Sequence, residues 1–194
     1  DLHSFPTRRS SDLWQIGLSM GGYQAFALYR LFPQRIHSLV LCDTRAEADD
    51  PEAARSREAF IEAVEKNGAT EAASRMMPNY FTPQTRKSNP SLVQQAERMI
   101  IRQSPETITS AMRAIMNRTD SAAMLKTISC PVLVLNGSED CLTTAETARS
   151  IAESVSGAAL QLIPGAAHLA NMEQPKLFSR ALLDHLGKTA YPCR

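Results

Sequence analysis

A serine flanked by glycines stands where an apolar strand pattern gives way to a helix pattern, and this junction constrains the fold more than any other feature. Residues 14–18 have the character of a short strand, and Gly17-Leu18-Ser19-Met20-Gly21 runs on from it into a helix pattern over residues 23–32. The spacing G-x-S-x-G between strand and helix is typical of a sharp turn that holds the serine oxygen exposed, and its small glycines let that turn pack. The sequence therefore predicts Ser19 as a nucleophile, with an ordinary glycine-rich turn as the alternative.

Apolar runs of strand length recur later in the chain, at residues 36–42, 131–136 and 159–163. Continuous runs of this kind are typical of parallel strands that helices cover on both faces. Helix patterns at about 144–155 and 174–187 follow the last two runs. The order of strands and helices predicts an α/β fold with a parallel sheet.

The intervening residues 45–127 are polar and helical in pattern, with no strand signal. Asp50-Pro51 and Ser104-Pro105 each combine a helix N-cap with proline at the first helical position. We expect helices at about 51–66, 69–77, 91–103 and 105–117. The predicted organisation is an α/β core at residues 14–44 and 128–188, interrupted by a helical lid at 45–127.

The first residues differ in character from the rest. Residues 1–13, DLHSFPTRRSSDL, are polar, rich in Arg and Ser, and without helical or strand periodicity. They resemble a translated sequencing adapter, so we expect a non-native or disordered tail. On that expectation the chain is an N-terminally truncated piece of a longer protein.

A serine hydroxyl needs a base, and histidine is the usual base near neutral pH. His168 lies in the Gly- and Ala-rich loop after the strand at 159–163, where it can reach over the carboxyl edge of the sheet. A carboxylate must in turn orient the imidazole. Asp140 follows the strand at 131–136 at the same edge and is the predicted acid, while Asp43, after the strand at 36–42, is the competing candidate.

Four stretches carry a resemblance to a known family: IGLSMGG, LVLCDTRAEADDPEAAR, PVLVLNGSEDCLTT and LIPGAAHLANMEQP. They are similar to the C-terminal part of the α/β-hydrolase superfamily, in the branch of 3-oxoadipate enol-lactonases and related small-molecule esterases. The resemblance implies that the backbone N–H of Met20 is one donor of an oxyanion hole. The second donor normally comes from an earlier loop that this sequence lacks, so we expect the 194-residue chain to be poorly active or inactive.

The function expected is hydrolysis of small carboxylic esters or lactones through an acyl-serine intermediate. C–C bond hydrolysis, haloperoxidase chemistry, acyl transfer, and an inactive ligand-binding member of the fold remain alternatives. Methionines and arginines of the helical block are candidates for contacting an apolar or carboxylate-bearing substrate, although packing and solvation explain them as well. These residues are Met76, Met77, Met99, Met112 and Met116, with Tyr80 and Phe81, and Arg75, Arg98, Arg102 and Arg113.

Composition excludes several other classes of protein. Lys and Arg total 21 against 20 for Asp and Glu, a balance that does not favour nucleic acid as a partner. No apolar run approaches the roughly 18 residues of a membrane helix. The four cysteines contain no C-x-x-C pair, so neither a metal nor a cofactor is expected. We expect a cytoplasmic protein whose partner is a small-molecule ester or lactone.

Overall fold

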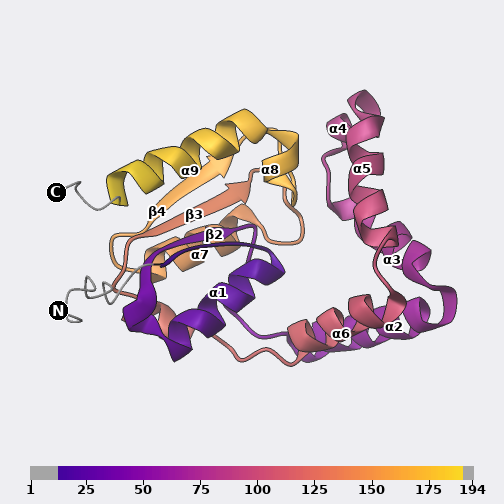
Figure 1. The fold of residues 1–194 in the computed structure, drawn as a ribbon, viewed down its shortest axis with the longest axis horizontal. Coiled ribbons are helices and arrows are strands. Elements are labelled where there is room, and N and C mark those ends of the chain that lie inside the picture. Colours follow the sequence, from indigo (N-terminus) through magenta and orange to yellow (C-terminus); the bar gives the residue numbers. More distant parts are fainter. Residues whose placement is uncertain (1–12, 190–194) are drawn as a thin grey trace, which may run out of the picture.

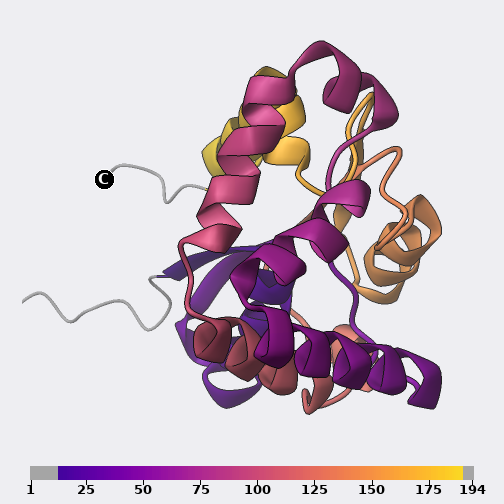
Figure 2. The ribbon, with the colours of Figure 1, turned by 90° about the vertical axis from the view of Figure 1, so that its right-hand side faces the viewer.

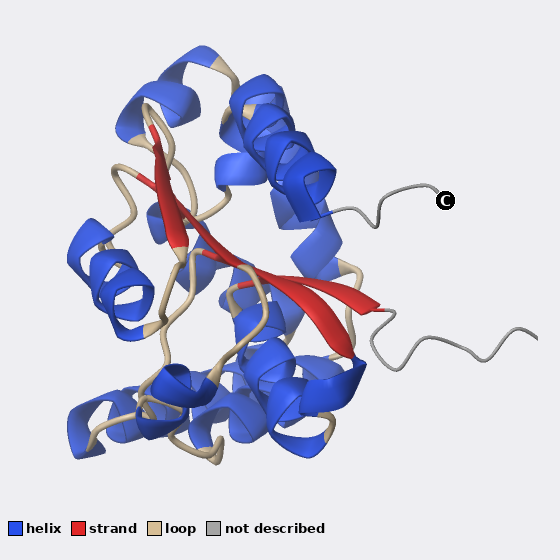
Figure 3. Cartoon of the chain, turned by 90° about the vertical axis from the view of Figure 1, so that its left-hand side faces the viewer, coloured by secondary structure: helices blue, strands red, loops and turns tan. Residues whose placement is uncertain are grey.

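In the computed structural model, which describes residues 13–189, four parallel strands form one sheet (Figure 1). The strands are β1 (Leu13–Leu18), β2 (Ile36–Cys42), β3 (Val132–Gly137) and β4 (Ala159–Ile163). They pair in the order β1-β2-β3-β4, and each neighbouring pair is parallel. The predicted α/β class with a parallel sheet is confirmed. Figure 3, with strands in red, shows the strong twist of this sheet.

Helices lie in the connections between these strands and, after β4, at the C-terminal end of the described chain. They are α1 (Met20–Leu31), α2 (Pro51–Asn67), α3 (Ala69–Met76), α4 (Pro83–Ser88), α5 (Pro90–Ile101), α6 (Pro105–Met116), α7 (Ala145–Ser154), α8 (Ala170–Glu173) and α9 (Pro175–Thr189). Short 3-10 turns occupy Pro33–Arg35, Met77–Asn79 and Ala123–Thr127. None of these described helices has the length and apolar character needed to cross a bilayer.

The central strand β2 is buried because each of its faces is covered by helices. Leu39 and Leu41 point into a core shared with α1 and α7. Val40 and Cys42 alternate with them and point into a second core with α9. Figure 1 shows α9 on one side of the sheet and α1 with α7 on the other. This double burial explains why β2 is continuously apolar in sequence.

The helical block α2–α6 lies between β2 and β3 in the chain and beside the sheet in Figure 1, so that in Figure 2 it stands in front of the strands. The side chain of Asp50 accepts a hydrogen bond from the N–H of Ala53, and Ser104 caps α6 in the same way. A small core of Met77, Phe81 and Ala96 packs against Leu169 on the loop that carries His168. The helical block therefore contacts the sheet edge where the candidate site residues lie. That it acts as a lid stays a prediction.

Most predicted elements begin or end within a few residues of the observed ones, and two of the differences lie on either side of Ser19. The helix expected at residues 23–32 begins at Met20, directly after Ser19, because the turn leads into α1 without a spacer. Leu13, assigned to the tail, is the first residue of β1 and pairs with Ile36. The rest of the predicted tail, residues 1–12, lies outside the described residues.

The helix α4 was not predicted. Pro83 lies between the helices expected at 69–77 and 91–103, where a proline indicates a break, but the hydroxyl of Thr82 accepts a hydrogen bond from Thr85 N–H and caps a helix there. Pro83 is then the first helical residue, where a missing N–H costs nothing. The same combination of cap and proline marks α2 and α6, so the signal for α4 was present in the sequence.

Candidate active site

Ser19 occupies a strained turn between β1 and α1. Its backbone has φ 52° and ψ −112°, in the left-handed half of the φ range that side chains other than glycine rarely adopt. Its N–H donates to Cys42 O across 2.8 Å, and its carbonyl accepts from the Thr44 hydroxyl across 2.9 Å. Strain of this kind costs about 1–3 kcal/mol and persists only where neighbours hold it. The turn is thus fixed by β2 and the residues after it.

Of the two glycines in the motif, close packing at the turn requires glycine at position 17 but not at position 21. A Cβ on Gly17 would lie 2.2 Å from the carbonyl oxygen of Gly21, so the strand can pass the first turn of α1 only with glycine there. A Cβ on Gly21 meets nothing within 4 Å among the described residues. Gly22, which the sequence analysis did not single out, would place its Cβ 2.3 Å from the Thr44 hydroxyl. Gly17 therefore has the predicted packing role. The second crowded position of the turn is Gly22, and Gly21 is not crowded.

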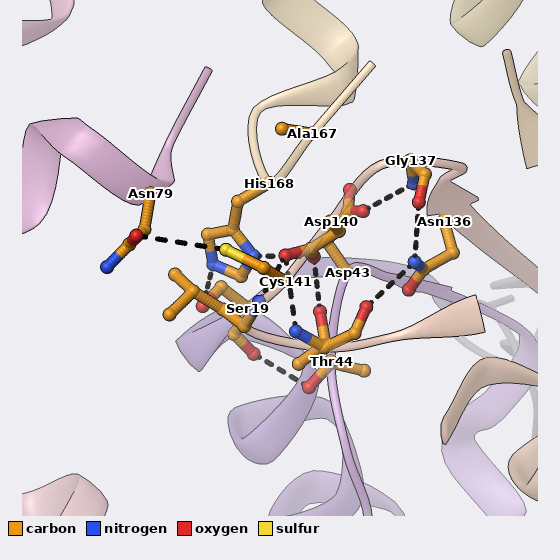
Figure 4. Close-up of polar contacts among 12 residues, drawn as sticks. Ser19, Asp43, Thr44, Asn79, Asn136, Gly137, Asp140, Cys141, Ala167 and His168 are labelled. Carbon is orange, nitrogen blue, oxygen red and sulfur yellow. Dashed lines mark hydrogen bonds and ion pairs between the residues drawn. The ribbon is translucent and has the colours of Figure 1, made fainter. Parts of the chain in front are cut away.

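The structure brings Ser19, His168 and Asp140 into one hydrogen-bonded chain (Figure 4). His168 Nε2 lies 2.8 Å from Ser19 Oγ, and its Nδ1 lies 2.8 Å from Asp140 Oδ2. The His168 side chain is buried, and so is that of Asp140. An imidazole held between a hydroxyl and a carboxylate can remove the hydroxyl proton and carry the resulting charge beside the carboxylate.

Asp140 is held in place by its own loop. The N–H groups of Leu142 and Thr143 donate to Oδ1 across 2.8 and 3.2 Å, and the Thr143 hydroxyl donates to Oδ2. Burial alone would raise the pKa of Asp140, but the hydrogen bonds from His168 and Thr143 and the His168 charge hold that pKa below its usual value. Asp140 therefore stays ionised and able to stabilise an imidazolium.

The run Thr143-Thr144-Ala145-Glu146 has the spacing of a capping box, which predicts Thr143 as the N-cap of the helix that follows, and that prediction is wrong. Thr144 is the N-cap of α7 and accepts from Thr147 N–H. The cap lies one residue later because Thr143 turns its hydroxyl inward to Asp140. Thr143 is a supporting residue of the site that the sequence analysis missed.

Asp43, the competing acid, is buried nearby but no hydrogen bond joins it to His168 in the described structure. Its Oδ1 accepts from the N–H of Gly137 across 2.7 Å, and its Oδ2 has no hydrogen-bond partner among the described residues. Burial, with further contributions from the charges of Asp140 and Glu173, raises the pKa of Asp43 to about 8. Asp43 therefore carries a proton at neutral pH.

Glu173 on α8 links the loop that carries His168 to the helical block through hydrogen bonds. The sequence did not indicate this residue. Its carboxylate accepts from the N–H of Ala167 across 2.6 Å, and from the N–H and hydroxyl of Thr82, each across 2.9 Å. The N–H of Leu169 donates to Tyr80 O, and the ring of Tyr80 lies 5.4 Å from that of His168. The loop bearing His168 is thus fixed from two sides.

Met20, the predicted oxyanion donor, is the first residue of α1 and lines the same cavity as Ser19. Backbone N–H groups in the first turn of a helix have no partner within the helix, and the helix dipole favours negative charge there. The N–H of Met20 therefore suits an oxyanion formed at a carbon bonded to Ser19.

A cavity of about 730 Å³ opens onto Ser19 and His168 between the sheet edge and the helical block. Of the residues proposed to contact substrate, Met76, Met99, Met112 and Tyr80 line it. The candidate arginines Arg75, Arg98, Arg102 and Arg113, for which solvation was the alternative, are not part of the lining, whereas Arg45 and Arg57 are. The helix pattern predicts that Arg75, Arg98, Arg102 and Arg113 lie on the helical block, but it does not indicate which face of each helix lines the cavity.

Two other histidines lie away from this cavity. His185 lies in the helix expected at 174–187, on a face that the helix pattern predicts to be at the surface, but its Nε2 lies 2.7 Å from the Ser38 hydroxyl and burial lowers its pKa. The ring of His37 packs edge-on against Trp14. Across residues 13–189 no group of three or more His, Cys, Asp or Glu side chains is arranged to hold a metal ion.

The comparisons with known proteins agree on one family. The family model described as "alpha/beta hydrolase fold" matches residues 10–175. A 3-oxoadipate enol-lactonase of Acinetobacter baylyi is 29% identical over 166 residues, which cover 86% of this chain and 60% of that relative. The chain therefore spans about 60% of the length of this curated relative.

Solved structures give the same result. A thermophilic esterase from Thermogutta terrifontis, with malate bound, superposes with a TM-score of 0.90 at 35% identity, covering 93% of this chain and 66% of that one. The enol-lactonase from Burkholderia xenovorans LB400 gives a TM-score of 0.83 at 26% identity, covering 93% and 67%.

Proposed function

Because the chain belongs to the α/β hydrolase fold family, we propose that it hydrolyses small carboxylic esters or lactones through an acyl-serine intermediate on Ser19. The observation that carries the proposal is the hydrogen-bonded chain from Ser19 Oγ through His168 to Asp140. The similarity to an esterase and to enol-lactonases supports the substrate class.

In the first half-reaction His168 Nε2 takes the proton of the Ser19 hydroxyl while Oγ attacks the carbonyl carbon of the substrate. Asp140 keeps Nδ1 protonated and stabilises the imidazolium that forms. The N–H of Met20 donates to the developing oxyanion. Collapse of the tetrahedral intermediate breaks the bond to the leaving oxygen, which receives the proton from His168.

The second half-reaction repeats these steps with water. His168 takes a proton from a water molecule, whose oxygen attacks the acyl-serine carbonyl, and the carboxylic acid leaves as the proton returns to Ser19 Oγ. The largely apolar cavity, with Met76, Met99 and Met112 in its wall, suits a small apolar acyl or lactone group.

The test is hydrolysis of p-nitrophenyl acetate and of a γ-lactone by the protein and by its Ser19→Ala variant. Turnover by the parent protein, slow as the sequence analysis expects, should fall to the uncatalysed background in Ser19→Ala, because that variant has no nucleophile. Ser110→Ala, at an exposed position on α6, is the matched control and should leave turnover unchanged. Turnover that survives Ser19→Ala would contradict the proposal.

A further inference from the structure

The imidazole of His168 lies against an aromatic ring from the helical block. The rings of Tyr80 and His168 are 5.4 Å apart between centroids, and their planes are tilted by 33°, nearer to stacked than to edge-on. Both imidazole nitrogens are engaged elsewhere, Nε2 with Ser19 and Nδ1 with Asp140. The contact of Tyr80 with the imidazole is therefore made by the ring and not by the phenol hydroxyl.

The segment that carries Tyr80 is anchored beside the site by its neighbours. The carbonyl of Tyr80 accepts from the N–H of Leu169, in the loop that carries the base, across 3.1 Å. Asn79 Oδ1 accepts from Cys141 Sγ, in the loop that carries the acid, across 3.8 Å (Figure 4). Phe81, on the other side, is buried in the small core of the helical block. The ring of Tyr80 is thus held against the imidazole from both sides along the chain.

An aromatic ring in this place favours the charged form of the base. The proposed mechanism turns a neutral imidazole into an imidazolium in each half-reaction. The face of an aromatic ring attracts a cation within about 6 Å, and more strongly where water is excluded. The His168 side chain is only 4% exposed. Because the charge develops during the reaction, this contact is stronger in the transition state than in the ground state.

Tyr80 itself adds no charge to the site at neutral pH. Burial raises the pKa of Tyr80 to about 12, although the positive charge of Arg57 opposes that rise. The phenol therefore does not compete with His168 for the serine proton. What Tyr80 offers the base is its ring, and a phenylalanine at this position would keep that ring.

We propose that Tyr80 is a positioning residue for the base. Its ring holds the His168 imidazole in line between Ser19 and Asp140 and stabilises the imidazolium that forms there. The helical block then supplies part of the catalytic machinery and not only a wall of the cavity. This inference rests on the proposed function, because it takes His168 as the base.

Kinetics of ring variants test the proposal. Tyr80→Leu, which removes the aromatic face, should lower kcat and kcat/KM for p-nitrophenyl acetate equally, by roughly 5- to 30-fold, the scale of a desolvated cation–π contact. Tyr80→Phe, which keeps the ring, should match the parent protein. Phe81→Leu removes a neighbouring ring of the same small core, and it should lower the melting temperature but leave kcat unchanged.

Proton NMR separates this inference from the proposed function, because it needs no turnover. The carbon-bound protons of the His168 imidazole, assigned by their loss in His168→Ala, are shifted by the ring current of a nearby aromatic side chain. Tyr80→Leu should move these resonances, while Tyr80→Phe and Phe81→Leu should leave them in place. If the parent protein turns over no ester, the proposed function fails, and these resonances still decide whether Tyr80 positions the imidazole.

Two results would overturn the inference. One is a Tyr80→Phe variant that loses as much kcat as Tyr80→Leu, because the hydroxyl and not the ring would then be the active group. The other is a Phe81→Leu variant that moves the His168 resonances as far as Tyr80→Leu does, because general packing of the helical block would then explain the effect.

Discussion

Asp43 accepts a hydrogen bond from the N–H of Gly137 with one carboxyl oxygen and leaves the other buried without a partner among the described residues. Its pKa is raised to about 8, chiefly by burial. The unfolded chain loses this proton near pH 3.9, so between about pH 4 and pH 8 the unfolded state binds fewer protons than the folded one. Stability therefore falls as the pH rises through that window.

Asp43→Asn should remove this dependence, because an amide keeps the acceptor for Gly137 and does not ionise. Relative to the variant, the parent protein should lose stability between pH 5 and pH 8 by about 1.4 kcal/mol per unit of pH at most. Urea unfolding at pH 5, 6.5 and 8 measures the difference. Asp184→Asn, at an exposed ion pair on α9, is the control and should follow the parent. Parallel profiles for the parent and Asp43→Asn would contradict the account.

Asp140 and Asp43 should differ sharply in their effect on turnover. Asp140→Asn should lower kcat by about 10⁴, since the amide no longer holds the imidazole in the tautomer that accepts the Ser19 proton. Asp43→Asn should lower it far less, because Nδ1 of His168 contacts Asp140. Initial rates with p-nitrophenyl acetate give the comparison. The opposite ranking would assign the acid to Asp43.

Glu173 should act by positioning the histidine loop. Glu173→Gln weakens the hydrogen bonds from Ala167 and Thr82, and we expect a loss of about 1–3 kcal/mol in the free energy of unfolding. We also expect a fall in kcat that exceeds the change in KM, because the loop carries the base and not the substrate contacts. Glu139→Gln, at an exposed neighbour, is the control. A purely structural role would leave kcat of the folded variant unchanged.

The glycines of the turn give a matched pair. Gly17→Ala forces its new Cβ to within 2.2 Å of the carbonyl oxygen of Gly21, so β1 and α1 must separate. We expect a loss of at least 3 kcal/mol of stability and loss of activity, on the scale of severe overpacking. Gly21→Ala meets open space inside a helix and should be neutral or stabilising by up to about 1 kcal/mol. Thermal unfolding of both variants tests the contrast, and equal destabilisation would refute it.

The sequence was sufficient to predict the fold class and the family because the signals were local. Each strand is a continuous apolar run, and the turn at Ser19 has a fixed spacing of residue types. Proximity of Ser19, Asp140 and His168 could be expected from topology, since the carboxyl ends of parallel strands meet at one edge of the sheet. Their catalytic roles and the division at residues 45–127 stay predictions.

What the sequence could not provide depends on side-chain direction. Thr143 and Thr144 are identical residue types next to each other, and only the fold decides that Thr143 turns to Asp140 while Thr144 caps α7. Arg57 and Arg113 both lie on helices of the same block, yet only Arg57 lines the cavity. Long-range contacts of this kind leave no periodic signal along the chain.

Covalent labelling is the sharpest test of Ser19 as the nucleophile, because it requires an activated hydroxyl but not complete turnover. A fluorophosphonate probe should add one label to the parent protein, with peptide mass spectrometry placing it on Ser19. The label should be absent in Ser19→Ala and strongly reduced in His168→Ala. No labelling of the folded parent protein, or labelling that is equally fast in His168→Ala, would contradict the account.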